Sequence, residues 1–196
     1  MIILYVDDCI IISKTKEEAD AIFADLTNKG FKMTDGGTME DYLGILITHG
    51  EDGSFRMSQP HLIDRIIESI PGMKDARSAT TPASAGVTLT KDEIGEPRKE
   101  HWNYRSVIGM LNYLVNCTHP EMLFAVHQCA RFCNDPKHSH EQAVKRVLRY
   151  LIGTTRNDSA NREASQGIIY RPDKTKSIDN YVDASFAGDW NTDCSE

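Results

Sequence analysis

Two adjacent aspartates near the start of the chain are the first residues whose type and spacing could do chemistry. Asp7 and Asp8 lie between two apolar runs rich in β-branched residues, 1–4 and 9–12. Such runs around an Asp pair predict a tight hairpin with both carboxylates at or near its bend. Neighbouring anions repel, so both charges are stable only in water or beside a cation. Carboxylates suit Mg²⁺, and paired Mg²⁺ ions serve phosphoryl transfer. The alternative is a solvated turn.

A second group of residues has the chemistry of a zinc site. Its members are Cys129, Cys133, His138 and His140, all of which can ligate zinc. Cysteines four residues apart on an apolar helix are more typical of a packed core, and the short gap before the histidines leaves little room for structure between the pairs. The pattern therefore favours packing over metal binding.

A basic segment surrounds one predicted helix, opposed within it only by Glu141. Its members are Lys137, Lys145, Arg146, Arg149 and Arg156. A solvated helix face is the ordinary interpretation of such a run. Contact with a nucleic-acid backbone is the alternative, because residues four apart share one face of a helix and Arg can bind phosphate with a bidentate fork.

The overall composition limits these alternatives. The 196 residues allow one or two domains, and 22 basic against 29 acidic residues give a net charge of −7. That sign is unfavourable for a polyphosphate ligand, so any nucleic-acid contact must be a local basic strip. Five cysteines, an odd number without a secretory context, predict reduced intracellular thiols. The first twelve residues lack a basic start and carry two Asp, which argues against a signal or membrane helix.

The first half of the chain predicts strands and helices that could position the Asp pair. Thr15-x-x-Glu18 is a capping box, so a helix should begin there and end at Lys29-Gly30. Short strands are expected at 31–33, 42–48 and 55–58, and a second helix from residue 58 or 59 to 70. Residues 73–99 are rich in Pro, Gly, Ala, Ser and Thr, which predicts a linker or a long surface loop.

The second half predicts a small helical bundle followed by two strands. Apolar periodicity indicates helices at 102–117, 120–133 and 139–152, and short connections make them antiparallel neighbours. Strands are expected at 167–170 and 178–184. The fold class predicted from these elements is α+β, with a helix covering one face of a sheet.

Six stretches, in order along nearly the whole chain, resemble the motifs of one family. Tyr5-Val6-Asp7-Asp8 resembles the signature of reverse transcriptases. The others are similar to motifs of copia-type retrotransposon polyproteins: 35–44, with Gly36 where Leu is usual, 104–114, 118–122, 140–154 and 181–189. Each match alone is weak, and their order makes the resemblance specific.

The resemblance implies how the chain is divided. Residues 1–58 would be the C-terminal part of a reverse-transcriptase palm, with its sheet, covering helix and a primer-grip-like strand. Residues 59–100 would be a helix and linker, and 101–156 a three-helix thumb bundle. Residues 157–196 would be a connection and the incomplete β start of a ribonuclease H-like domain.

The resemblance also implies site residues and partners. Asp7 and Asp8 would be catalytic metal ligands of the polymerase, and Asp183 the first catalytic metal ligand of ribonuclease H. Nucleic-acid contacts would be made by two sets: Tyr42, Leu43 and Gly44 of the primer grip, and Lys145, Arg146 and Arg149 of the thumb. The implied cofactor is Mg²⁺, with Mn²⁺ as an alternative. The partners are an RNA/DNA primer–template and, in the full-length parent, deoxynucleoside triphosphates, with no membrane; the oligomeric state stays open.

The family's polymerase uses a third Asp from an earlier strand, which with the fingers would precede Met1, and Asp183 lacks its later partners. We therefore expect a truncated RNA-directed DNA polymerase that is inactive alone, because half a ligand set does not hold two metal ions in fixed geometry. The expected location is intracellular, in the cytoplasm (a virus-like particle) or the nucleus, and not secreted. The alternative is a non-catalytic nucleic-acid-binding or protein-interaction remnant.

Overall fold

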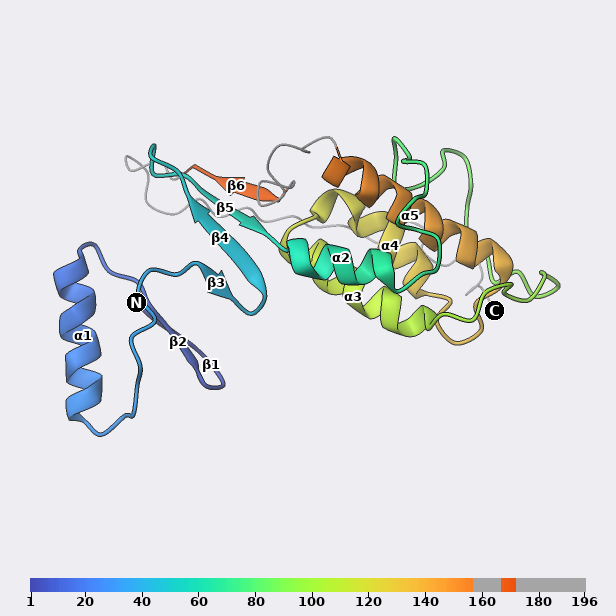
Figure 1. Ribbon diagram of the computed structural model, residues 1–196. Coiled ribbons are helices and arrows are strands. Elements are labelled where there is room, and N and C mark those ends of the chain that lie inside the picture. The colour runs from blue at the N-terminus through green and yellow to red at the C-terminus, as the bar shows by residue number, and fades with distance from the viewer. Residues whose placement is uncertain (157–166, 172–196) are drawn as a thin grey trace, which may run out of the picture. The chain divides into compact units, whose positions relative to one another are not determined.

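The structure, a computed structural model, describes residues 1–156 and 167–171, drawn in colour in Figure 1. Asp183 and the predicted strand at 178–184 lie outside the described residues. The chain separates into two compact units, Met1–Met39 and Glu40–Glu196.

The first unit is a hairpin followed by one helix. Strands β1 (Ile2–Tyr5) and β2 (Asp8–Ile11) pair antiparallel, which confirms the hairpin predicted from the two apolar runs. Helix α1 (Lys16–Asn28) is capped by Thr15, whose Oγ1 accepts a hydrogen bond from the Glu18 N–H at 3.3 Å. The predicted cap is therefore confirmed.

The strand predicted at residues 31–33 is wrong. These residues have no regular secondary structure and follow Gly30, which has a positive φ of 94°. A glycine in this conformation is a common end of a helix. An extended segment becomes a strand only where another segment pairs with its backbone, and local sequence does not encode that partner.

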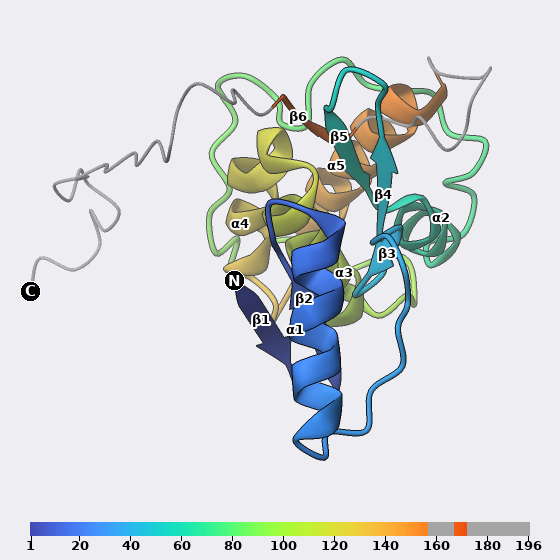
Figure 2. The same ribbon diagram turned by 90° about the vertical axis from the view of Figure 1, so that its left-hand side faces the viewer.

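The second unit opens with a four-stranded antiparallel sheet in the order β3-β4-β5-β6 (Figure 2). The strands are β3 (Asp41–Tyr42), β4 (Ile45–His49), β5 (Phe55–Ser58) and β6 (Ile168–Tyr170). The single strand predicted at 42–48 is thus two strands joined by a reversal. Strand β5 was predicted at its observed bounds. In the turn between β4 and β5, Asp52 Oδ1 accepts the Ser54 N–H at 2.9 Å.

The predicted strand at 167–170 is confirmed as β6, and its partner is β5. The register places Phe55 opposite Tyr170 and Met57 opposite Ile168. The rings of Phe55 and Tyr170 stack with their centroids 5.0 Å apart. A segment far along the chain therefore completes the sheet that begins at residue 41, in place of opening a separate sheet.

Gly167 allows this close approach, and we expect Gly167→Ala to detach β6. A Cβ atom at this position would lie 2.0 Å from the carbonyl oxygen of Met57, which belongs to the backbone of β5 and has no rotamer to yield. The expected result is loss of amide protection in Ile168–Tyr170 in hydrogen exchange, with the helices still protected. Gly109→Ala is the control, because a Cβ at Gly109 meets nothing within 4 Å. Unchanged protection of β6 in Gly167→Ala would contradict the pairing.

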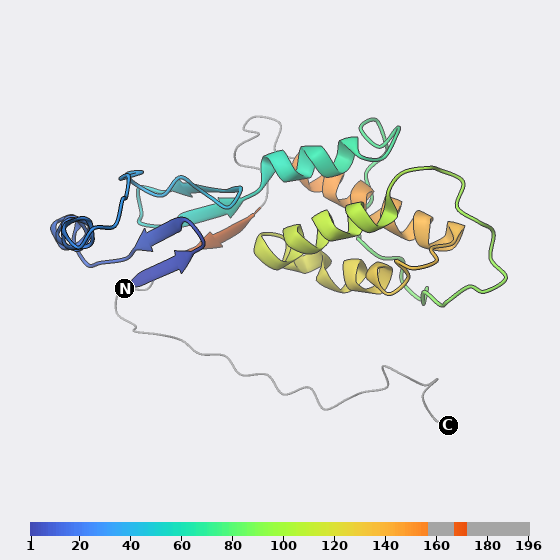
Figure 3. The same cartoon turned by 90° about the horizontal axis from the view of Figure 1, so that it is seen from below.

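After this sheet, the described part of the second unit consists of helices and their connections (Figure 3). They are α2 (Pro60–Glu68), α3 (Tyr104–Cys117), a 3₁₀ turn η1 (Pro120–Met122), α4 (Leu123–Ala130) and α5 (His138–Arg156). All four helices predicted for this part of the chain are present with shifted ends. Helix α3 begins later than expected because the Asn103 side chain caps it, accepting the Ser106 N–H at 3.0 Å.

One apolar core joins all four helices. Its fully buried members include Ile66 of α2, Leu111 of α3, Val126 of α4 and Leu148 of α5. Helix α2, predicted as part of a separate helix-and-linker region, thus shares its core with the three predicted thumb helices. An amphipathic helix is stabilised mainly by burying its apolar face, and here the other three helices supply the surface.

The α2–α3 loop comprises residues 69–103. Its long middle part has little regular structure, as predicted, but it is not a free linker. Met73 and Trp102 belong to the buried core, and Leu89 packs against it. In Figures 1 and 3 the loop is the green segment that runs beside α5. No helix among the described residues has the length and apolarity needed to cross a membrane.

Candidate nucleic-acid interface

The hairpin of the first unit presents the Asp pair at its end. Tyr5 pairs with Asp8, so Val6 and Asp7 are the two residues of the turn. Both aspartates are solvent-exposed. The carboxylates of Asp7 and Asp8 are therefore accessible to water or to a cation at the end of the hairpin.

Val6 has a conformation that L residues rarely adopt. Its φ is 52° and its side chain is 87% exposed. The left-handed region is unfavourable for a β-branched residue, at a cost on the order of 1–3 kcal/mol. Backbone strain of this kind persists where a tight turn over-determines it and is often found at functional sites. Here it holds Asp7 at the tip of the hairpin.

The donor set of this hairpin fits a hard divalent cation in part. Mg²⁺ is usually bound by one or two carboxylates together with substrate phosphates and water, and Asp7 and Asp8 supply two carboxylates. In the described residues, 1–156 and 167–171, no group of three or more His, Cys, Asp or Glu side chains is placed to hold a metal ion. Asp183, the third predicted metal ligand, lies outside that part of the chain.

The predicted primer-grip residues form a reversal. Tyr42 pairs with Ile45, and the two residues between them, Leu43 and Gly44, have φ values of 54° and 74°. Two consecutive positive φ angles are typical of the two-residue hairpin turn that matches the twist of its strands. Gly44 adopts this conformation without a steric cost. Leu43 does not.

A contact from α3 stabilises the unusual turn. The Tyr113 hydroxyl donates a hydrogen bond to the Leu43 carbonyl oxygen at 2.6 Å, across 70 residues of sequence. The sequence did not predict this role of Tyr113. Its position in the 104–114 motif was visible, but periodicity alone does not pair a helix residue with a distant turn.

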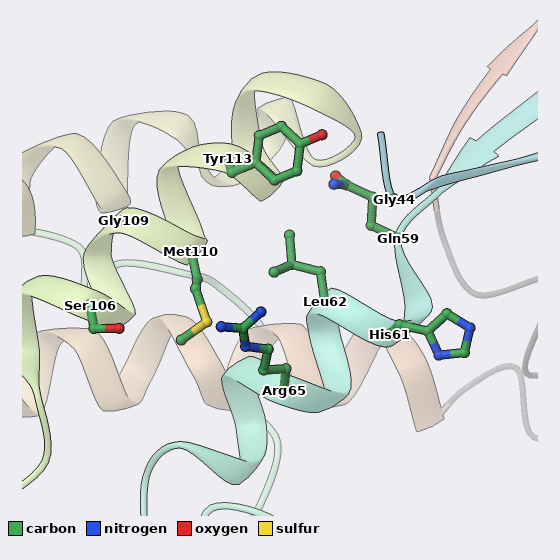
Figure 4. A pocket seen from close by; sticks show the side chains of 9 residues that line it. All are labelled: Gly44, Gln59, His61, Leu62, Arg65, Ser106, Gly109, Met110 and Tyr113. Carbon is green, nitrogen blue, oxygen red and sulfur yellow. The ribbon is translucent and has the colours of Figure 1, made fainter. Parts of the chain in front are cut away.

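A groove of about 570 Å³ lies beside this turn, between α2 and α3 (Figure 4). Nine described residues line it: Gly44, Gln59, His61, Leu62, Arg65, Ser106, Gly109, Met110 and Tyr113. These lining residues include hydrogen-bond donors and a cation but neither Asp nor Glu. Most of the lining is apolar; Arg65 supplies its positive charge, and no carboxylate of the lining would oppose an anion bound beside it.

Gln59 is the buried polar residue of this groove. Its side chain is fully buried, and its Oε1 accepts a hydrogen bond from Thr118 Oγ1 at 2.9 Å. Its Nε2 has no hydrogen-bond partner among the described residues. Figure 4 shows the amide directed toward Tyr113, with Leu62 and Arg65 projecting from α2 on the same side. A buried donor without an acceptor is unfavourable, and a ligand oxygen or a water would satisfy it.

The predicted basic face of α5 is not open. Lys145 is only 12% exposed and forms an ion pair with Glu100. Arg146 Nη2 donates to Thr81 Oγ1 at 2.9 Å. Arg149 is half-buried, and its backbone oxygen accepts the Ala79 N–H at 3.1 Å. The assumption that these three residues stand free on the helix surface is wrong, because the α2–α3 loop lies against them.

Two of the four residues considered for zinc, Cys129 and His140, are buried in the helical unit. Cys129 is buried, and burial raises the pKa of its thiol to about 12. His140 is buried, stacks on Phe132 and uses both ring nitrogens, one with the Lys137 N–H at 2.9 Å and one with the Thr90 oxygen at 2.7 Å. A protonated thiol and an imidazole with both nitrogens bonded are poor metal ligands. Cys129 and His140 therefore serve packing.

Glu141 is buried and joins the α2–α3 loop to α5, which the sequence did not indicate. Its carboxylate accepts hydrogen bonds from Trp102 Nε1 at 3.2 Å and from the Lys99 N–H at 3.1 Å, and it lies 3.1 Å from His138 Nδ1. A lone acid in a basic helix predicts solvent exposure, yet Glu141 is 0% exposed. Buried carboxylates occur where several donors surround them.

Comparisons with known proteins agree with the motifs. The pattern of the family "Reverse transcriptase (RNA-dependent DNA polymerase)" matches residues 1–85. The chain is 33% identical over 195 residues to a retrovirus-related Pol polyprotein from transposon TNT 1-94 of Nicotiana tabacum and 28% identical over 187 residues to one from transposon RE1 of Arabidopsis thaliana. A putative transposon Ty5-1 protein of Saccharomyces cerevisiae is 28% identical over 186 residues.

These matches cover most of this chain and a smaller part of the relatives. The tobacco match covers 96% of this chain, the Arabidopsis match 95% and the yeast match 94%. The chain spans 14% and 12% of the two plant polyproteins and 56% of the yeast protein. No solved structure gives a significant match.

Proposed function

Because this chain belongs to the copia-type retrotransposon reverse transcriptases and corresponds to one segment of their Pol polyproteins, we propose that it contributes primer–template binding and two metal-ligating carboxylates to RNA-directed DNA synthesis. The observation that carries this proposal is the groove between α2 and α3, with its cation, its buried unpaired donor and its lack of acidic lining residues.

The groove binds the sugar–phosphate backbone of one strand. Arg65 is exposed on α2 and meets a phosphate oxygen with its guanidinium group. Gln59 Nε2 donates to a second ligand oxygen, and Gly109 leaves that part of the α3 surface without a side chain. The turn at Leu43 and Gly44 closes one end, held by Tyr113. Contacts to phosphate and sugar position a duplex without reading its sequence.

In the whole protein, Asp7 and Asp8 would hold the divalent cation of the polymerase reaction. A Mg²⁺ ion held there would supply positive charge to the triphosphate and Lewis acidity to the primer hydroxyl. The contribution of this chain is geometric, because the turn at Val6 and Asp7 places both carboxylates at the end of the β1–β2 hairpin. Mn²⁺ is an alternative ion for the same oxygen ligands.

The test is binding of a labelled RNA–DNA hybrid with a recessed 3′ end, followed by fluorescence anisotropy at several salt concentrations. We expect Arg65→Gln to weaken binding and to reduce the slope of log K against log[salt] by about one. Arg77→Gln is the control, since it removes the same charge from an exposed residue of the α2–α3 loop outside the groove. Equal losses in the two variants would refute the groove as the binding site.

A further inference from the structure

The two cations at the centre of α5 are both held by the α2–α3 loop. Lys145 forms an ion pair with Glu100, and Arg146 donates to Thr81. The Nε of Arg146 is buried without a hydrogen-bond partner in the described part of the chain, and so is Oε2 of Glu100. Each contact therefore leaves hydrogen-bonding capacity unused. A phosphate oxygen could accept a hydrogen bond from Arg146 Nε, the unused donor of this pair of contacts.

Further contacts repeat along the helix and fasten the loop at both ends. Near the end of α5, the Ala79 N–H donates to the Arg149 oxygen at 3.1 Å. Near its start, the Thr90 oxygen contacts His140 at 2.7 Å, and Trp102 donates to the buried Glu141 at 3.2 Å. The loop thus crosses α5 lengthwise, consistent with its course in Figures 1 and 3.

The part of the loop between these attachments buries little. Within 80–88, most residues are exposed and none is fully buried, and Val87 stands in solvent. Leu89 only partly packs against the core. A segment with few buried apolar contacts opens locally at a low free energy, while anchors such as Trp102 and Glu141 stay in place. Residues 80–88 can therefore move without unfolding the bundle, and the Glu100 side chain can rotate away from Lys145 while its backbone stays attached.

We propose that the α2–α3 loop is an autoinhibitory strap. The Glu100 carboxylate binds the Lys145 ammonium and the Thr81 hydroxyl binds the Arg146 guanidinium, where phosphate oxygens would otherwise bind. A phosphodiester backbone binds this face of α5 only by displacing both side chains. The proposal rests on the proposed function, since it assigns to the same nucleic-acid ligand a second binding surface. It also explains how the loop keeps the basic side chains of α5 covered until a polyanion of higher charge density than the loop competes for them.

The first test removes the competing carboxylate. We expect Glu100→Gln to bind the RNA–DNA hybrid several-fold more tightly at low salt than the parent chain, with the salt slope steeper by about one because Lys145 becomes available to a phosphate. Glu93→Gln is the matched control: it removes the same charge from the same loop, where Glu93 pairs with exposed Lys91 at 2.8 Å. Equal gains in Glu93→Gln and Glu100→Gln would reduce the effect to net charge and overturn the strap.

Two further changes separate release of the two cations from a general gain in positive charge. Thr81→Ala releases Arg146 without a change of charge, so it should also increase affinity, and circular dichroism should show an intact bundle. Adding Lys145→Gln to Glu100→Gln should abolish the gain, whereas adding Arg65→Gln should lower affinity and leave the gain. Persistence of the gain without Lys145 would contradict the proposal.

The outcomes also distinguish this proposal from the groove. If Arg65→Gln binds like the parent while Glu100→Gln gains affinity, the groove is wrong and the strap stands. If Arg65→Gln weakens binding and neither Glu100→Gln nor Thr81→Ala changes it, the groove stands and the strap is wrong. If the parent chain and Glu100→Gln both fail to bind the hybrid at low salt, both proposals are overturned.

Discussion

Replacing Glu141 by alanine is expected to destabilise the helical unit by about 3 kcal/mol, because each buried donor left without a partner costs about 1–3 kcal/mol. The Trp102 indole N–H and the Lys99 backbone N–H both donate to this carboxylate. Urea denaturation followed by circular dichroism measures the change. A midpoint within error of the parent's would contradict a structural role for the buried acid.

The control is Glu96→Gln, which removes an exposed acid of the same loop that pairs with Lys99 at 3.1 Å. It should leave the midpoint unchanged, because exposed ion pairs contribute little. Glu141→Gln keeps the shape of the side chain and removes its charge. This variant therefore separates the electrostatic part of the effect from the packing part.

Acid titration of stability gives an independent check on Glu141. Burial raises the pKa of this carboxyl, but hydrogen bonds from Lys99 and His138 and the nearby charges of Lys145 and Arg98 outweigh burial, so its pKa lies below the usual 4.5. Its stabilisation is therefore present above about pH 4.5 and is lost as the pH falls through the folded-state pKa. Stability should fall less in Glu141→Gln than in the parent between about pH 6 and about pH 3.

The second large effect is expected for Ile66→Ala in α2. Ile66 is 0% exposed and lies in the same core as Trp102. Removing three carbon atoms from a fully packed site costs about 2–5 kcal/mol, as lost transfer free energy and as a cavity. Fluorescence of Trp102, measured with Trp190 replaced by Phe in every variant, should report the loss, because Trp102 at the end of the α2–α3 loop shares one core with α2.

Ile94→Ala is the matched control for this variant. Ile94 is fully exposed at 101%, so the same substitution there should not shift the urea midpoint. If Ile66→Ala left the midpoint of the Trp102 transition unchanged, α2 would not belong to the core of α3, α4 and α5. A second, earlier transition confined to circular dichroism would show the same.

Elements with a strong local signal were predicted from the sequence. The capping box at Thr15 and Glu18 places the start of α1, because the cap is formed by residues three apart. The apolar runs around Asp7 and Asp8 predict the hairpin, and its observed turn is at Val6 and Asp7. The positions of these carboxylates agree with the sequence interpretation, and their catalytic role stays a prediction.

Features that depend on distant partners were not predicted. The reversal at Leu43 and Gly44 interrupts a stretch that looks like one strand, and the hydroxyl of Tyr113 stabilises it from α3. Lys145 looks free by helical periodicity, yet it pairs with Glu100 at the end of a stretch whose composition predicts only a linker or a long surface loop. Neither contact has a signature within a window of neighbouring residues.

The sequence by itself determined the family, the α+β class, the four helices of the second unit and the location of the Asp pair. Each of these depends on residue order within short windows, where capping, periodicity and motif spacing act. Only the tertiary structure decided that β6 pairs with β5, that Gln59 lines a groove, and that the α2–α3 loop covers α5. Those outcomes depend on which buried donors and acceptors meet after the chain folds, because a buried polar group stabilises the fold only with its partner in place.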